Sequence, residues 1–225
     1  MDLGLLALLI FPFLLSLYAQ YKVKSSFREM SRIPTNLSGA QAARRMLDAS
    51  GLESVGIERV PGHLSDHYDP RAKVLRLSKD VHDGRSMAAL GVACHEAGHA
   101  FQDAQSYAPL VIRNLAVPAA NFGSSISGIL LMLGIVMSIK PLLWLGIILF
   151  STVVFFQLVN LPVEFDASAR AKKQLVGLGM IADNDSYYIS KVLNAAALTY
   201  VAATLQSVMT LLYYIMHAFS GRDSE

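Results

Sequence analysis

Charged residues are scarce in this sequence. Only 16% of its 225 residues are Asp, Glu, Lys or Arg, whereas soluble domains average about 25%, and 53% of the residues are hydrophobic. The formal net charge of +2 gives no signal for binding nucleic acid or another polyanion. These shortages exclude an ordinary soluble domain and a disordered chain. They predict a small membrane protein that contacts the lipid bilayer and has no nucleic-acid partner.

Cysteine is nearly absent as well. The chain has one cysteine, Cys94, which excludes an intrachain disulfide framework and any zinc or iron–sulfur site built from several cysteines. We expect Cys94 to be a small buried residue.

Four apolar segments are candidate membrane spans. A spanning helix needs about 20 mostly apolar residues, so the first segment is short and the other three suffice. No Lys or Arg precedes the first segment, unlike the basic start of a signal peptide, and we therefore expect an uncleaved anchor. A tight hairpin turn is predicted at Lys140-Pro141. The four segments are residues 3–19, 114–139, 141–163 and 192–216.

Basic residues are concentrated between these segments. Residues 20–113 and 164–191 together hold 17 of the 19 Lys and Arg. Because loops rich in Lys and Arg stay in the cytoplasm, we expect a multi-pass protein of the cell membrane with both termini outside. The predicted parts are an anchor helix (1–20), a cytoplasmic α+β part (21–113), a transmembrane hairpin (114–163), a helix (164–191), and a C-terminal transmembrane helix with a short tail (192–225).

The polar part contains local signals for two helices and two strands. Ser38 suits the N-cap of a helix and Gly51 the left-handed position at its end. The alternation of residues 73–78 predicts a half-buried strand, and residues 55–60 are a further strand candidate. Residues 86–105 are predicted to form a long helix.

The long helix carries the motif that indicates chemistry. His95-Glu96-Ala-Gly-His99 is an H-E-x-x-H sequence, which places two histidines one helical turn apart on one face. Both imidazoles can then bind one zinc ion, and Glu96 can act as general base on a zinc-bound water. The alternative is a pair of buried histidines with ordinary hydrogen bonds.

A catalytic zinc keeps three protein ligands and one open position, so one more ligand is needed. The continuation H-x-x-G-x-x-H is excluded because Gln102 and Gln105 stand where glycine and histidine would be. An aspartate from a downstream Asp-Gly motif is excluded because the only Asp-Gly, at Asp83, precedes the helix.

A glutamate ligand remains. After His99 the chain has only two glutamates, Glu164 and the terminal Glu225. Glu164 follows the third apolar segment, at its cytoplasmic end, so elimination makes Glu164 the third predicted ligand. The alternative is an interfacial glutamate that stabilises the start of a helix.

The order of these motifs along the chain resembles that of known families. The layout of HEAGH, a hydrophobic hairpin and a glutamate at the return is similar to that of the HtpX-like membrane proteases and the CaaX prenyl proteases. A closer resemblance is to the bacterial YugP-like family of neutral zinc metallopeptidases. It is carried by DHYDPRAKVLRLS (66–78), GVACHEAGHAFQDA (91–104), LPVEFDASARA (161–171) and AALTYVAA (196–203).

The resemblance implies a mainly α membrane protein with about four transmembrane helices and a small zincin-like catalytic part of gluzincin type. It also implies a zinc peptidase with ligands His95, His99 and Glu164. One position departs from the HtpX-like pattern, in which an aspartate four residues after the ligand glutamate supports the first histidine. Here that position is Ser168, and the nearby acid is Asp166.

Several side chains around the motif have open roles. Metal-bound histidines usually donate their second N–H to a carboxylate or carbonyl, and Asp103 and Asp166 are the two candidates. We expect Gln102 to serve in packing or as a helix cap. The candidates for stabilising a developing oxyanion are His63, His67, Tyr68, Arg170 and Tyr200, whereas His82 and His217 are not expected to reach the zinc.

The resemblance further implies that the strand at residues 73–78 is an edge strand that pairs with the substrate backbone. The alternative is an ordinary strand of the sheet. The leading hypothesis is a membrane-bound zinc endopeptidase that cleaves proteins or peptides at the cytoplasmic face, with Glu96 as general base. The alternatives are a zinc hydrolase of a non-peptide substrate and a catalytically silent, zinc-stabilised membrane scaffold. The intact Glu96 argues against a silent site, which has no need of a general base. The sequence does not indicate an oligomeric state.

Overall fold

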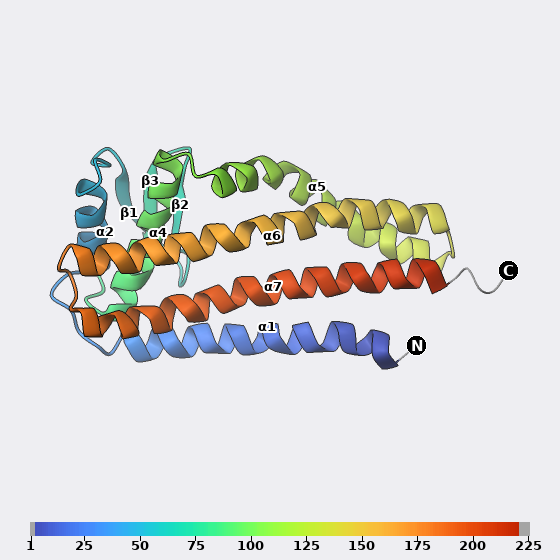
Figure 1. Ribbon diagram of the computed structural model, residues 1–225, viewed down its shortest axis with the longest axis horizontal. Coiled ribbons are helices and arrows are strands. Elements are labelled where there is room, and N and C mark those ends of the chain that lie inside the picture. Colours follow the sequence, from blue (N-terminus) through green and yellow to red (C-terminus); the bar gives the residue numbers. More distant parts are fainter. Residues whose placement is uncertain (1–2, 221–225) are drawn as a thin grey trace. The chain divides into compact units, whose positions relative to one another are not determined.

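The computed structural model describes residues 3–220 and is mainly helical (Figure 1). The chain forms two compact units. The first, here called the apolar unit, contains Val111–Pro162 with the described residues up to Ala19 and from Thr199 onward. The second, here called the α+β unit, contains Gln20–Leu110 and Val163–Leu198.

Three helices in the described part of the chain are long and apolar enough to cross a membrane, by length and composition. They are α5 (Ala108–Val136), α6 (Lys140–Gly177) and α7 (Ser186–Ser220), the last joined to a short 3-10 turn, η1 (Asp183–Asp185). The predicted first span lies in α1 (Leu3–Met30), which is a helix but is not among these three. A fourth span therefore stays a prediction.

The turn between α5 and α6 lies slightly earlier than predicted. The N–H of Ile139 bonds to the carbonyl of Gly134 at 2.9 Å, and Ser138 has a left-handed φ of 56°. Lys140 and Pro141 are therefore not the turn but the first residues of α6. Proline fits there because the first turn of a helix has no partner for its N–H groups.

A three-stranded sheet lies beside two helices in the α+β unit (Figure 1). Its strands are β1 (Gly56–Val60), β2 (His67–Asp69) and β3 (Val74–Ser78). Strand β3 pairs parallel with β1 and antiparallel with β2, so the order is β1-β3-β2. The prediction that residues 73–78 form an edge strand is wrong, because the unpredicted strand β2 covers that side of β3.

Helix α2 (Gly39–Asp48) begins as its sequence indicates. The Ser38 side chain accepts from the N–H of Gln41, and the Gln41 side chain accepts from the N–H of Ser38, which is a complete capping box. Beyond the helix, Gly51 has a φ of +71°, as expected for a residue that reverses the chain after a helix.

Helix α4 (Met87–Ala104) is the centre of the α+β unit. The Ser86 side chain caps it by accepting from the N–H of Ala89, and most of the side chains of α4 are buried. A short helix, α3 (Lys79–His82), precedes it. The core around α4 includes Met46 of α2, Leu75 of β3 and residues of α6 and α7, among them Leu175 and Leu193. This packing explains why the His95–His99 segment is buried although it is polar.

The third predicted ligand lies on a helix that is longer than expected. Glu164 is an interior residue of α6, which continues from the preceding apolar segment without a break. The predicted helix at residues 164–191 is instead divided, because α6 ends at Gly177 and α7 begins at Ser186. The assignment to a zincin-like, gluzincin-type fold stays a prediction.

Candidate metal centre

Two turns of helix bring three metal-binding side chains together in the α+β unit. His95 and His99 come from α4 and Glu164 from α6, and one ligand atom from each lies within 4.8 Å of the others. Glu164 Oε2 is 3.2 Å from His95 Nε2 and 3.6 Å from His99 Nε2. The three side chains are only 7–12% exposed. The predicted trio therefore converges on one point that is shielded from water.

A glycine permits this convergence. A Cβ atom placed on Gly98 would lie 2.7 Å from the carbonyl oxygen of Ala167, with the Ala167 Cα at 3.2 Å. The backbones of α4 and α6 therefore meet where Gly98 has no side chain. Because Ala167 is three residues after Glu164, this approach places the glutamate against the two histidines.

The donor set fits zinc. Two imidazole nitrogens and one carboxylate oxygen are common ligands of catalytic zinc, which leaves a fourth position open. Within residues 3–220, His95, His99 and Glu164 form the one cluster of three metal-binding side chains. A buried carboxylate between two rings is also the arrangement in which a cation offsets the cost of removing charge from water.

The second nitrogen of His95 faces an uncharged partner. Its Nδ1 atom is 3.1 Å from the hydroxyl of Ser168, at the position where the HtpX-like pattern has an aspartate. Ser168 is buried and lies one turn after Glu164 on α6. The structure therefore supplies a hydroxyl, and neither Asp103 nor Asp166, as the neighbour of this ring.

The second nitrogen of His99 faces Gln102. His99 Nδ1 and Gln102 Oε1 are 2.9 Å apart, and the Gln102 amide nitrogen donates to the carbonyl of Val163 and to Asp166 Oδ2, each at 2.8 Å. Arg170 in turn donates to Asp166 at 2.5 Å. Gln102 is fully packed, as expected, but its amide also bonds to His99 and to α6, and Asp166 is linked to His99 through it. No local sequence pattern singled out this glutamine.

Asp103 has a different role from the predicted one. Although it lies one turn after His99, its carboxylate accepts from the hydroxyl of Tyr68 at 2.7 Å and from Lys73 Nζ at 2.5 Å. Burial first, and then the hydrogen bond to Asp103, raises the pKa of the Tyr68 hydroxyl. That hydroxyl is therefore a protonated donor, and Asp103 ties α4 to the sheet.

Glu96 stands beside the cluster without joining it. Its Oε2 accepts a hydrogen bond from the backbone N–H of Tyr68, in β2, at 3.1 Å, and only 9% of the residue is exposed. Because that N–H points toward Glu96, it points away from β3. In an antiparallel ladder the carbonyl of the same residue also points away from the paired strand, so the outer edge of β2 lies beside Glu96, with its Tyr68 N–H engaged by that carboxylate.

The residues predicted as candidates for stabilising an oxyanion lie in different surroundings. Among the five oxyanion candidates, Tyr68 contacts Glu96 through its backbone N–H, whereas its hydroxyl donates to Asp103. Arg170 is held by Asp166 and Gln105 and lies over the Tyr107 ring. Two further candidates have partners of their own: His63 is 3.3 Å from Asp80, and His67 bonds to the carbonyl of Ser65. The last candidate, Tyr200, lies in the apolar unit. Of the two histidines not expected to reach the zinc, His217 lies in the apolar unit and His82 bonds to Asp83.

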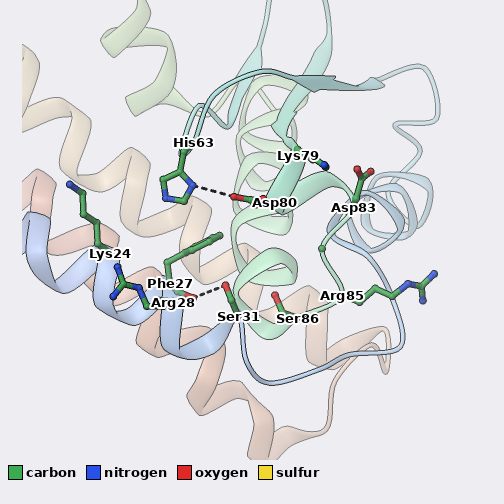
Figure 2. Close-up of a pocket in the computed structure, with 11 residues that line it drawn as sticks. Lys24, Phe27, Arg28, Ser31, His63, Lys79, Asp80, Asp83, Arg85 and Ser86 are labelled. Atoms are coloured by element: carbon green, nitrogen blue, oxygen red, sulfur yellow. Dashed lines mark hydrogen bonds and ion pairs between the residues drawn. The ribbon is translucent and has the colours of Figure 1, made fainter.

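A separate cleft in the α+β unit is not lined by any of the three candidate metal ligands (Figure 2). Its volume is about 660 Å³, and both cationic and acidic side chains line it. Asp80 and His63 face each other across it, and the Phe27 ring lies against His63. Because charges of both signs line the cleft, it does not select one class of ligand. Its charged residues are Lys24, Arg28, Lys79, Asp80, Asp83 and Arg85.

A buried centre of two histidines and a glutamate, in a chain with three helices of membrane-spanning length, defines a membrane-associated zinc-binding protein. The chain belongs to the family described as "Putative neutral zinc metallopeptidase", whose sequence profile matches residues 5–219. The cofactor is therefore zinc, and the centre described above is its candidate site.

A curated relative covers nearly the whole chain. The "Putative membrane protease YugP" of Bacillus subtilis (strain 168) is 49% identical over 211 residues, which are 93% of this chain and 94% of that protein. No solved structure matches the chain.

Proposed function

We propose that this protein is a membrane-bound zinc endopeptidase with His95, His99 and Glu164 as metal ligands and Glu96 as general base. The observation that carries the proposal is the position of Glu96. It neighbours the three converging side chains, is nearly buried, and is held by a backbone N–H instead of being part of the cluster.

Each residue has a defined task in the proposed reaction. A zinc ion, when bound, supplies a Lewis acid that polarises the scissile carbonyl and acidifies a water molecule. Glu96 takes the proton from the attacking water and delivers it to the leaving amine. Since the Tyr68 N–H occupies Oε2 of Glu96, the other carboxylate oxygen remains for this proton.

The position of β2 at the edge of the sheet supports a peptide as substrate. The backbone groups of Tyr68 face away from β3 and lie beside Glu96. An extended peptide can pair with such an edge through backbone hydrogen bonds, here by donating to the Tyr68 carbonyl, because Glu96 already accepts from the Tyr68 N–H. This pairing would bring the scissile bond to the base. Strand β2 thus takes the substrate-pairing role that was predicted for β3, which is paired with a strand on both sides. The edge favours a peptidase over a hydrolase of non-peptide substrates.

The location rests on charge. We infer four spans, with α1 as the fourth, and a cytoplasmic α+β unit, because 17 of the 19 Lys and Arg lie in residues 20–113 and 164–191. The proposed enzyme would therefore act on proteins or peptides at the cytoplasmic face of the membrane.

The test compares the purified full chain with the Glu96→Gln variant in detergent, using unfolded casein as substrate. We expect both proteins to bind zinc near one per chain and the variant to lose about 10²–10⁴-fold in cleavage rate. Chelation should stop the wild-type reaction. Equal cleavage by the two proteins would exclude Glu96 as the base, and no cleavage by zinc-loaded wild type of any unfolded protein would contradict the peptidase.

A further inference from the structure

Gln102 is a fully buried polar side chain that lies on α4 and contacts α6, the two helices of the metal centre. It is 0% exposed, sits on α4 three residues after His99, and bonds to His99, Val163 and Asp166. Val163 immediately precedes Glu164 on α6. The three bonds of this amide thus involve a candidate metal ligand, His99, and two residues within two positions of another, Glu164.

The partners of the amide determine which way it points. A backbone carbonyl can only accept a hydrogen bond, so the group that faces Val163 must be the NH₂ of Gln102. The Asp166 carboxylate, which accepts from Arg170, also demands a donor. Both acceptors lie 2.8 Å from the same nitrogen. The oxygen of the amide is therefore the atom that faces His99.

This orientation selects one form of the His99 ring. An amide oxygen can only accept, so His99 Nδ1, 2.9 Å away, must carry the hydrogen. In a neutral imidazole the other nitrogen then has the lone pair. That other nitrogen, Nε2, is the atom that faces Glu164, where the metal has to bind.

We propose that Gln102 is a positioning residue that locks His99 in the Nδ1–H tautomer and fixes α6 beside it, so that His99 Nε2 and Glu164 are ready for zinc. The proposal rests on the assignment of these residues as the zinc centre. Ser168 does not have the same effect on His95, because a hydroxyl can both donate and accept. The two histidines are thus supported unequally.

Two substitutions at this position separate the proposal from a packing role. Gln102→Leu keeps a similar volume but removes the acceptor, whereas Gln102→Glu keeps an acceptor for His99 but places a second acid beside Asp166. If Gln102 fixes the tautomer, zinc affinity should fall by about 10–100-fold in Gln102→Leu and by less in Gln102→Glu. If Gln102 only fills the core, the order reverses, because a buried acid costs more than a buried leucine.

The tautomer is measured directly by NMR of the metal-free full chain labelled with ¹⁵N-histidine, at a pH where the rings are neutral. The chain has 6 histidines, and comparison with His99→Gln assigns the ring. We expect His99 to carry its hydrogen on Nδ1 in the wild type and in Gln102→Glu, and to lose this preference in Gln102→Leu. Ser168→Ala is the matched control and should leave the His99 signal unchanged.

The wild-type spectrum decides the question even if a variant does not fold. A hydrogen on Nε2 of His99 in the wild type would overturn the proposal, as would tighter zinc binding by Gln102→Leu than by Gln102→Glu. A failure of the zinc assignment is distinguishable, because it would appear as wild-type protein that binds no zinc while the tautomer signal is still present.

Discussion

The approach of α4 and α6 at Gly98 makes a demanding prediction for Gly98→Ala. The added Cβ would lie 2.7 Å from the carbonyl oxygen of Ala167, whereas ordinary contact starts at 3.4 Å. The two backbones must therefore separate by about 0.7 Å, the difference between these distances. Zinc–ligand distances tolerate only about 0.2 Å. Because Glu164 is one turn from Ala167, this separation would move it out of bonding range of a metal held by His95 and His99.

The energetic effects of the substitution oppose each other. Overpacking costs about 1–3 kcal/mol, and alanine in place of a helical glycine returns about 0.5–1 kcal/mol. We expect the metal-free protein to lose about 0–2.5 kcal/mol of unfolding free energy while it still folds. Zinc affinity should fall by more than about tenfold, since a ligand lost in part costs more than an outer contact.

The assay is competition for zinc between the purified protein in detergent and a chromophoric chelator, with thermal unfolding of the metal-free protein alongside. Gly177→Ala is the matched control, because Gly177 is on the helix that carries Glu164 and an added Cβ meets nothing within 4 Å. Wild-type zinc affinity in Gly98→Ala, with Gly177→Ala also unchanged, would refute the argument that close backbone approach positions the ligand.

Three further predictions test the ligand set, the pH dependence and the topology. Glu164→Gln should weaken zinc binding far more than Asp166→Asn, for which a loss of about 10–100-fold is typical; the reverse order in a zinc competition assay would make Asp166 the ligand. The pKa of Asp69 lies at about 2 instead of 3.8, because its carboxylate accepts from an arginine side chain and two backbone N–H groups. The stabilisation that Asp69 provides is therefore present above about pH 4 and lost as the pH falls toward 2, so Asp69→Asn should reduce the unfolding temperature at pH 6 and make no difference near pH 2. In a background without the native cysteine, an impermeant thiol reagent should label Met137→Cys in intact cells and not Ser54→Cys; labelling of the second alone would place the α+β unit outside.

Much of the site followed from local sequence. The spacing of His95 and His99 places two imidazoles on one helical face wherever the helix forms, because residues four apart are neighbours on a helix. Glu164 could be found by elimination, because glutamates are so few after His99. Its approach to the histidines, by contrast, depends on the close contact at Gly98, which a pattern of residue types does not encode.

The supporting contacts were decided by tertiary structure. Sequence spacing directed attention to Asp103 as a partner of His99, but Tyr68 and Lys73, which are distant along the chain, bind its carboxylate. Gln102 takes that place because packing against α6 gives its amide two fixed acceptors. A hydrogen-bond partner is selected by what lies within about 3 Å, and this depends on how helices and strands pack.

The sheet shows the same division. The alternation in residues 73–78 is a local property of the chain and correctly indicated a strand, β3. The central position of β3 in the sheet could not be predicted from the sequence, because its neighbour β2 has only three residues and is too short to show a period of two. The sequence by itself therefore determined which segments are apolar and which residues are candidate metal ligands. The tertiary structure alone decided the neighbours of each candidate ligand and which strand lies at the edge of the sheet, since both arise from contacts between segments far apart in the chain.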